Sequence, residues 1–321
     1  MFHKSFTVDQ TAQICQFYDQ NGYVLILDVL TQQDCQNTTD EVDKLFKSFD
    51  DGFDIRDPIT YDLMKITGRY GIPTKEPLFS PELVKNRNNP KIWKAFQSLY
   101  QHIDTQRGKY KPGQEDIPLI VNHDRVGFYR PTLCNGREDW KTPYKYPNVH
   151  LDLDPKLYKD HSGIVAEIQS KFNYQEHDRY FITENNFISG SNGPVLQGLI
   201  SIWDNYSDDG GLQVVPGFHK QFDEWYQKKA DKGLMNHKAG EETLWGFKSS
   251  DMIDMEYVHT PVRVAMPAGS IAIWDKRLAH GSVPNNSDHG RLIQFLVLNR
   301  KKNFSEKLLK NREKALQKLI N

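Results

Sequence analysis

The sequence contains few cysteines, no excess of charge of one sign and no long apolar run. Its three cysteines, Cys15, Cys35 and Cys134, are too widely spaced for a disulfide framework or a CxxC zinc site, and they favour a reducing compartment. The 41 Lys and Arg residues balance 42 Asp and Glu residues, which argues against binding to nucleic acid or to an anionic membrane. No segment approaches the roughly 18 apolar residues of a transmembrane helix, and the N-terminus lacks an apolar secretory segment. We therefore expect a cytoplasmic protein with no stable membrane association and no nucleic-acid partner.

Aromatic side chains and short apolar segments are abundant. Aromatic residues make up 12% of the 321 residues and hydrophobic residues 38%, which suits a single domain over residues 1–321 with one large core. Short apolar segments punctuated by Gly and Pro turns are typical of a β-sandwich or barrel. We expect strands at 126–130, 149–153, 195–203, 212–215, 262–266, 270–274 and 291–298. The sequence thus predicts a mainly β fold with flanking helices.

The N-terminal part predicts the flanking helices. Residues 8–20 have apolar side chains at helical spacing, and residues 23–27 form a continuous apolar run typical of a strand covered on both faces. Thr31 and Asp34 resemble a capping box, which predicts that a second helix begins there. A third helix is expected over residues 89–100.

Two polar stretches and a terminal helix interrupt or extend this pattern. Insertions near residues 156–194 and 220–257 lie between the two halves of the candidate site described next, so they suit a lid over a substrate; solvated surface decoration is the alternative. Residues 303–321 predict a basic amphipathic helix. Such a helix docks its apolar side on the parent domain, or lies on a membrane or a partner.

The pattern His-x-Asp at His150 and Asp152, followed far along the chain by His280, predicts a metal site. Two histidines and one carboxylate are the ligand set of the non-haem Fe(II) facial triad, which leaves coordination positions open for chemistry. In a strand, side chains at i and i+2 point to the same face, so one strand could supply both His150 and Asp152. By the same alternation Asp154 is a competing ligand.

Three further residues suit the binding of an organic cosubstrate. Arg291 begins an apolar strand, and its planar guanidinium matches the distal carboxylate of 2-oxoglutarate. Ser282 could add a hydroxyl to the same carboxylate, and Gln197 is a further candidate contact. Trp274 is interpreted mainly as core, and Arg130 is the best candidate for an anionic group of the substrate.

Three segments together resemble the phytanoyl-CoA dioxygenase family. They are residues 21–30 before the capped helix, residues 210–220 with a Gly-Gly turn and the sequence Pro-Gly-Phe-His, and residues 279–288 followed by Arg291. Their order and joint occurrence extend the resemblance over about residues 10 to 298.

The resemblance implies a double-stranded β-helix core, also called a jelly roll or cupin-like fold, that uses Fe(II), 2-oxoglutarate and dioxygen, with ascorbate as a stimulant. It carries the metal role onto His150, Asp152 and His280, and the cosubstrate role onto Arg291 and Ser282. Halogenating relatives replace the ligand carboxylate with a small residue, so Asp152 points to hydroxylation or another oxidation.

The sequence therefore predicts a 2-oxoglutarate-dependent hydroxylase acting on an aliphatic C–H bond of a small molecule and releasing succinate and CO2. Two alternatives remain: a cupin-like metal-binding sensor without turnover, and a zinc hydrolase, because three protein ligands and a water also describe catalytic zinc. Neither the identity of the substrate nor the oligomeric state follows from the sequence.

Overall fold

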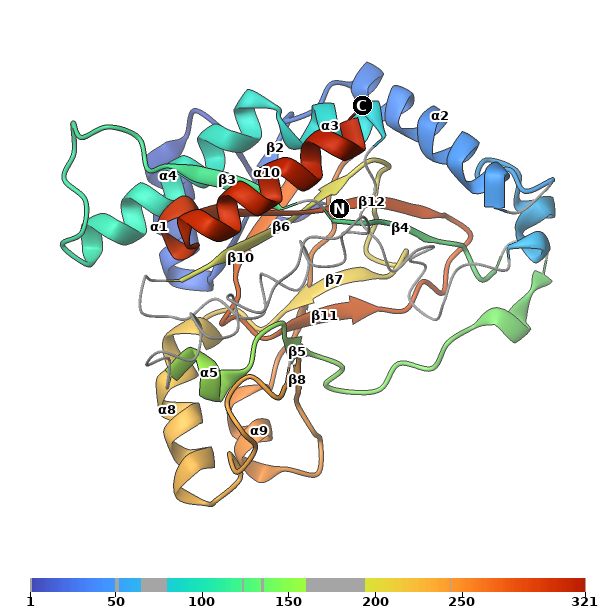
Figure 1. Cartoon of the computed structure of the whole chain (residues 1–321). Coiled ribbons are helices and arrows are strands. Elements are labelled where there is room, and N and C mark those ends of the chain that lie inside the picture. The colour runs from blue at the N-terminus through green and yellow to red at the C-terminus, as the bar shows by residue number, and fades with distance from the viewer. Residues whose placement is uncertain are drawn as a thin grey trace.

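The computed structural model describes residues 2–49, 52–64, 80–122, 124–133, 136–159, 194–242 and 244–320. Within these ranges two β-sheets lie against each other, and helices cover the outer face of the larger one (Figure 1). A smaller group of helices lies beyond the small sheet, at the opposite end of the molecule in this view.

The large sheet has the strand order β1-β2-β10-β6-β12-β3, and β4 also pairs with β12. All its neighbours are antiparallel except β1 and β2. Its strands are β1 (Phe6–Thr7), β2 (Tyr23–Leu27), β3 (Leu119–Asn122), β4 (Val126–Tyr129), β6 (Leu196–Ser201), β10 (Ile271–Asp275) and β12 (Arg291–Arg300).

The small sheet has the order β8-β5-β11-β7-β9 and is antiparallel throughout. Its strands are β5 (His150–Leu151), β7 (Gly211–Val214), β8 (Trp245–Gly246), β9 (Val262–Arg263) and β11 (His280–Val283). Strand β8 belongs to the insertion at residues 220–257 and pairs with β5, so this insertion is partly an edge of the sheet rather than only surface decoration.

Alternation along the central strands separates two cores. In β10, Ile271 and Ile273 belong to the core beneath the helices, whereas Ala272 and Trp274 face the small sheet. Strand β2 divides in the same way, with Val24 on the helix side, so the prediction of a strand covered on both faces is confirmed. The space between the sheets holds the cavity described below.

Helices pack on the large sheet through the apolar faces that the sequence predicts. The second helix begins with the expected capping box: the Asp34 backbone N–H donates to Thr31 Oγ1 (3.1 Å), and the Thr31 N–H donates to Asp34 Oδ2 (3.0 Å). The helices are α1 (Thr11–Asn21), α2 (Gln32–Phe49), α3 (Pro81–Arg87), α4 (Pro90–Gln106), α5 (Pro155–Lys159), α8 (Phe218–Asp231), α9 (Met252–Tyr257) and α10 (Glu306–Ile320), with short 3-10 turns at Pro58–Leu63, Glu138–Trp140 and Lys301–Asn303.

The C-terminal helix docks on its own domain. Leu308 of α10 and Phe304 before it are buried against Val195 and Val297 of the large-sheet region. This contact supports the docking interpretation of residues 303–321. In the described part of the chain, no helix has the length and hydropathy needed to span a membrane.

Two sequence-based expectations need correction, and a third concerns residues that the structure does not describe. The fold is not mainly β, because more of the described residues are in helices than in strands. The strand expected over 149–153 ends at Leu151. Most of the insertion at 156–194 (residues 160–193) and Cys134 lie outside the described residues, so the proposed lid is not tested there.

Candidate functional site

His150, Asp152 and His280 converge at one point between the sheets. Their ligand atoms all lie within 4.8 Å of one another. The Nε2 atom of His150 is 3.4 Å from Asp152 Oδ1, and that of His280 is 3.4 Å from Asp152 Oδ2. Two ligands at right angles, each about 2.1 Å from a metal, are about 3 Å apart, so the three residues fit one ion. Among the described residues, no other group of three such side chains is found.

The sheet places the two histidines directly opposite each other. His280 on β11 pairs in register with His150 on β5, and their ring centroids are 4.7 Å apart. His280 is buried and its Nδ1 lies 2.9 Å from the Leu278 carbonyl oxygen, to which an Nδ1–H would donate. That hydrogen bond leaves Nε2 unprotonated and directed at Asp152, as a metal ligand requires.

Asp152 reaches the site by a different route from the one expected. It lies in a bend just after β5 rather than in the strand. In the metal-free site, desolvation raises the pKa of the Asp152 carboxyl, but the charges and hydrogen bonds of His150 and His280 in their protonated forms outweigh it, so the net pKa is well below the ordinary value. The carboxylate is therefore ionised and available as a ligand.

Gln197 contacts the carboxylate of Asp152. Its Nε2 donates a 2.9 Å hydrogen bond to Asp152 Oδ2, while its own Oε1 is buried without a partner. Gln197 was expected to contact the cosubstrate, and its position also suits a residue that orients a metal ligand.

Replacing Gln197 with leucine keeps the side-chain volume but removes the donor to Asp152. We expect the affinity for Fe(II) or Co(II) to fall about tenfold, because groups that orient ligands typically contribute that much. Metal titration followed by absorbance or calorimetry measures it. Gln36→Leu, an exposed position on α2, is the matched control. Equal metal affinity in the wild type and Gln197→Leu would contradict this role.

Asp154, the competing ligand, is engaged elsewhere. Its Oδ1 accepts hydrogen bonds from the backbone N–H groups of Lys156 (2.8 Å) and Leu157 (3.2 Å), and it lies 2.8 Å from His237 Nε2. Its Oδ2 accepts from the Gly240 N–H at 2.6 Å. Asp154 thus caps the start of α5, which turns the chain out of the sheet and explains why β5 ends so early.

The variant Asp154→Asn distinguishes a role of Asp154 as a helix cap from a role as a metal ligand. We expect the variant to keep its metal affinity and to lose about 1–2 kcal/mol of the free energy of unfolding. The reason is that an asparagine amide has one acceptor oxygen, so it cannot accept both from the N–H groups at the start of α5 and from the Gly240 N–H. Metal titration and urea denaturation on the same samples measure the two quantities. A loss of metal affinity as large as that in Asp152→Ala would instead make Asp154 a ligand.

A cavity of about 370 Å³ opens beside the three candidate ligands. Its wall includes the predicted Gln197 and Ser282, and Asp124 with Arg125 adds a charged pair. Trp274 is buried in the core, as expected, and it also lines the cavity, where its ring centroid is 5.2 Å from that of His280. Further apolar wall residues are Leu199, Leu212, Leu244 and Phe295.

Arg291 is fully buried and lies behind the cavity wall at Tyr129. The centre of its guanidinium is 4.7 Å from the centroid of the Tyr129 ring, which lines the cavity. Its Nε and Nη1 have no hydrogen-bond partner, and burial lowers the pKa of the group. Buried donors without partners are costly, so these two nitrogens are candidates to bind an acceptor from outside the protein.

Arg130 does not meet its expectation. It follows the last residue of β4, donates to the Tyr61 carbonyl (3.1 Å) and is not among the residues that line the cavity. Sequence reasoning also missed Arg263 on β9, whose guanidinium lies beside that of Arg291 across Gly211. The available signal was a charged residue within the otherwise apolar segment 262–266.

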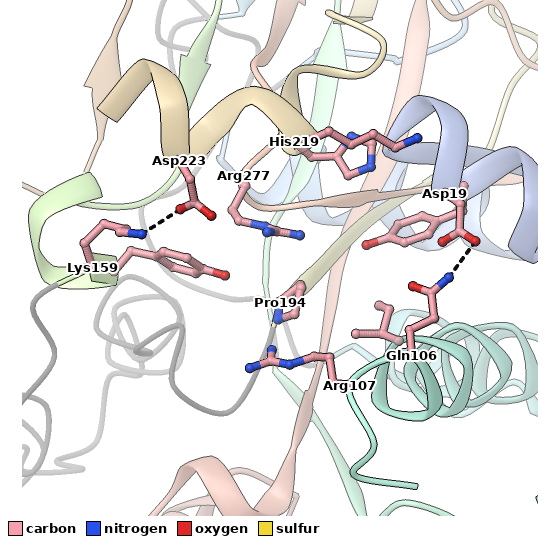
Figure 2. Close-up of a pocket in the computed structure, with 12 residues that line it drawn as sticks. Asp19, Gln106, Arg107, Lys159, Pro194, His219, Asp223 and Arg277 are labelled. Atoms are coloured by element: carbon pink, nitrogen blue, oxygen red, sulfur yellow. Dashed lines mark hydrogen bonds and ion pairs between the residues drawn. The ribbon is translucent and has the colours of Figure 1, made fainter. Parts of the chain in front are cut away.

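A second cleft, of about 640 Å³, lies apart from the candidate ligands (Figure 2). Arg277 and Arg107 point toward its middle, and Lys159 pairs with Asp223 at one side (2.8 Å). Arg277 also holds the buried Asp275 through two hydrogen bonds, of 3.0 and 2.8 Å.

Three other histidines, His219, His259 and His289, fit structural or surface roles. His219 is buried with its ring centroid 6.1 Å from that of Tyr18, and it lines the second cleft. His259 and His289 are exposed, and His161 lies outside the described residues.

Comparisons with known proteins show what this chain is similar to. A sequence model of the family described as phytanoyl-CoA dioxygenase (PhyH) matches residues 18–293. The chain is 33% identical over 288 residues to a Dictyostelium discoideum protein named "Putative phytanoyl-CoA dioxygenase", covering 88% of this chain and 74% of that relative.

Two solved structures are similar in fold. One is the epimerase SnoN in complex with Fe3+, alpha ketoglutarate and nogalamycin RO (TM-score 0.50, 15% identity, 90% of this chain and 83% of that one). The other is GlcNAc Inducible Gene 2 from Candida albicans (TM-score 0.55, 13% identity, 89% and 62%).

Proposed function

The chain belongs to the phytanoyl-CoA dioxygenase family, and from this premise we propose that it hydroxylates an aliphatic C–H bond of a small molecule. The family makes it an Fe(II)- and 2-oxoglutarate-dependent enzyme, so a zinc hydrolase and a metal-binding sensor without turnover are set aside. The two sheets, antiparallel apart from the pair β1–β2, support a double-stranded β-helix as the core. The free, buried thiols of Cys15 and Cys35 fit a cytoplasmic location.

His150, Asp152 and His280 are the proposed iron ligands, and their convergence within 4.8 Å is the observation that carries the proposal. The donor set of two imidazoles and one carboxylate suits Fe(II). When bound, the iron supplies, with 2-oxoglutarate and dioxygen, the oxidant for the substrate C–H bond, and succinate and CO2 are released. Asp152 as a carboxylate favours hydroxylation over halogenation.

Arg291 is the proposed partner of the distal carboxylate of 2-oxoglutarate. Its unpartnered Nε and Nη1 supply two donors, and a guanidinium matches a carboxylate in bidentate geometry. Ser282 lines the cavity near by and is proposed as a further donor to the same group. Gln197 is proposed to orient Asp152, in addition to the cosubstrate contact that the sequence predicts.

Other residues in and around the cavity prepare His280 for metal binding and suit the cavity to a small substrate. The Leu278 carbonyl holds the proton of His280 at Nδ1, so Nε2 stays free at the ligand position. Apolar side chains such as Leu199, Leu212 and Phe295 exclude water from the reacting region. A cavity of about 370 Å³ suits a small molecule, with Asp124 and Arg125 available to polar groups of the substrate.

The test is succinate formation by the purified protein with Fe(II), ascorbate, 2-oxoglutarate and oxygen. We expect slow succinate release without added substrate, faster release with the right small molecule in a metabolite screen, and loss of both on chelation. Under anaerobic conditions, Fe(II) and 2-oxoglutarate together should give a charge-transfer absorbance. No succinate and no absorbance band, from a protein that binds iron, would overturn the proposed function.

A further inference from the structure

Two arginines lie side by side behind the cavity: Arg291 is buried and Arg263 is half-buried. A Cβ built on Gly211 would lie 2.7 Å from Arg291 Nε and 2.9 Å from Arg263 Nη2, so the two guanidinium groups meet at the bare Cα of this glycine. The sheet brings them together: Gly211 starts β7, Arg263 is on the neighbouring β9, and Arg291 starts β12 of the other sheet.

Arg263 is held rigidly, and only by neutral acceptors. Its Nη1 donates to the carbonyl oxygens of Leu212 (3.0 Å) and Val264 (2.6 Å). Its Nη2 donates to Asn205 Oδ1 (2.7 Å) and the Tyr206 carbonyl (3.2 Å), while Nε has no partner. These bonds fix the position of the cation but do not neutralise its charge.

The pair lacks a carboxylate partner of its own. Within the part of the chain that the structure describes, neither Arg263 nor Arg291 has a carboxylate oxygen within 4 Å of its nitrogens. Asp209 is the acidic residue with the largest effect on the pKa of Arg263. Its carboxylate already accepts hydrogen bonds from the Tyr206 N–H (2.8 Å) and from Ser287 Oγ (3.0 Å). Burial and then the charge of Arg291 lower the pKa of Arg263, as expected for two cations that repel each other in a dry environment.

We propose that Arg263 is a positioning and specificity residue, a fixed second cation that makes the Arg291 side of the cavity selective for 2-oxo dicarboxylates over 2-oxo monocarboxylates. An incoming carboxylate at Arg291 would be attracted by both cations and would relieve their repulsion. A monocarboxylic 2-oxo acid has no group to place there and gains nothing from the pair. This inference rests on the proposed function, because it assumes that the iron site takes a 2-oxo acid.

The experiment compares the dissociation constants of 2-oxoglutarate and 2-oxobutyrate, measured by calorimetry on the Fe(II)-loaded protein without oxygen. Both acids present the same 2-oxo acid end, and only the first has a distal carboxylate. In Arg263→Met we expect the preference for 2-oxoglutarate to fall about tenfold, with 2-oxobutyrate binding unchanged, since one nearby charge is lost. Arg263→Lys keeps the charge but not the four hydrogen bonds, and we expect it to retain most of the preference.

Lys220→Met is the matched control, because it removes one positive charge in the second cleft rather than behind the cavity. Thermal melting of each variant checks the fold, and Arg263→Gln, which keeps an amide donor, serves as the neutral variant where Arg263→Met does not fold. An unchanged preference in the neutral variant, or an equal loss in the folded Arg263→Lys, overturns the role of the charge. If the wild type binds neither acid in a metal-dependent way, the proposed function itself falls; if it binds both and only the Arg263 variants disagree, this inference alone falls.

Discussion

Replacing His150 or Asp152 with alanine is expected to reduce succinate formation from 2-oxoglutarate to background. Each change removes one of three candidate ligands whose donor atoms lie within 4.8 Å of one another, and we expect the two that remain to hold Fe(II) less tightly and without the full set of donors. The measurement is succinate released per enzyme, together with the iron retained after gel filtration.

His259→Ala is the matched control for this experiment, because His259 is an exposed histidine of the same chain and lies outside the cavity. We expect it to retain both iron and turnover. Undiminished turnover in His150→Ala and Asp152→Ala, with iron still bound, would remove these residues from the metal site.

Gly211→Ala is expected to weaken 2-oxoglutarate binding by about 100-fold or more, the scale of loss that a misplacement of about 1 Å can cause. The added Cβ would lie 2.7 Å from Arg291 Nε and 2.8 Å from Asn205 Oδ1, so Arg291 must move. The glycine also has a φ of +106°, and a side chain there costs about 1–3 kcal/mol of stability. Calorimetric titration with 2-oxoglutarate and thermal melting measure the two effects.

Gly113→Ala separates backbone strain from the contact with Arg291. Gly113 also has a positive φ, of +89°, but a Cβ there would meet no atom within 4 Å. We expect this variant to lose stability and to keep its affinity for 2-oxoglutarate. If Gly211→Ala binds 2-oxoglutarate as tightly as Gly113→Ala does, then Arg291 is not the carboxylate partner.

Much of the sheet could be predicted from local pattern. The apolar run at Tyr23–Leu27 and the capping box at Thr31 each depend on residues within a few positions, and both are found where expected. The sequence pattern underestimated the helical content, because the short helices α5 and α9 lie in stretches whose polar composition suggested insertions.

The candidate ligands could be predicted from spacing, but their geometry could not. Alternation along a strand placed Asp152 beside His150, whereas the chain leaves the sheet after Leu151 because Asp154 caps α5. The role of Gln197 depends on the packing of β6 against the small sheet, and a single sequence contains no sign of that distance. The Arg263–Arg291 pair depends on contacts between strands far apart in sequence.

The pairing of β5 in the small sheet implies that metal binding would stabilise the fold. Among the described strands, β5 joins β11 only through the pair His150–His280, and β8 is attached to β5 in turn. A metal ion bound by both histidines would link β5 to β11 where they share a single pair of residues, and we expect it to bind the native chain more tightly than the unfolded one. By mass action, free metal at about a hundred times its dissociation constant adds about 2.7 kcal/mol to the free energy of unfolding. We therefore expect the thermal stability of the protein to rise with the concentration of free Fe(II).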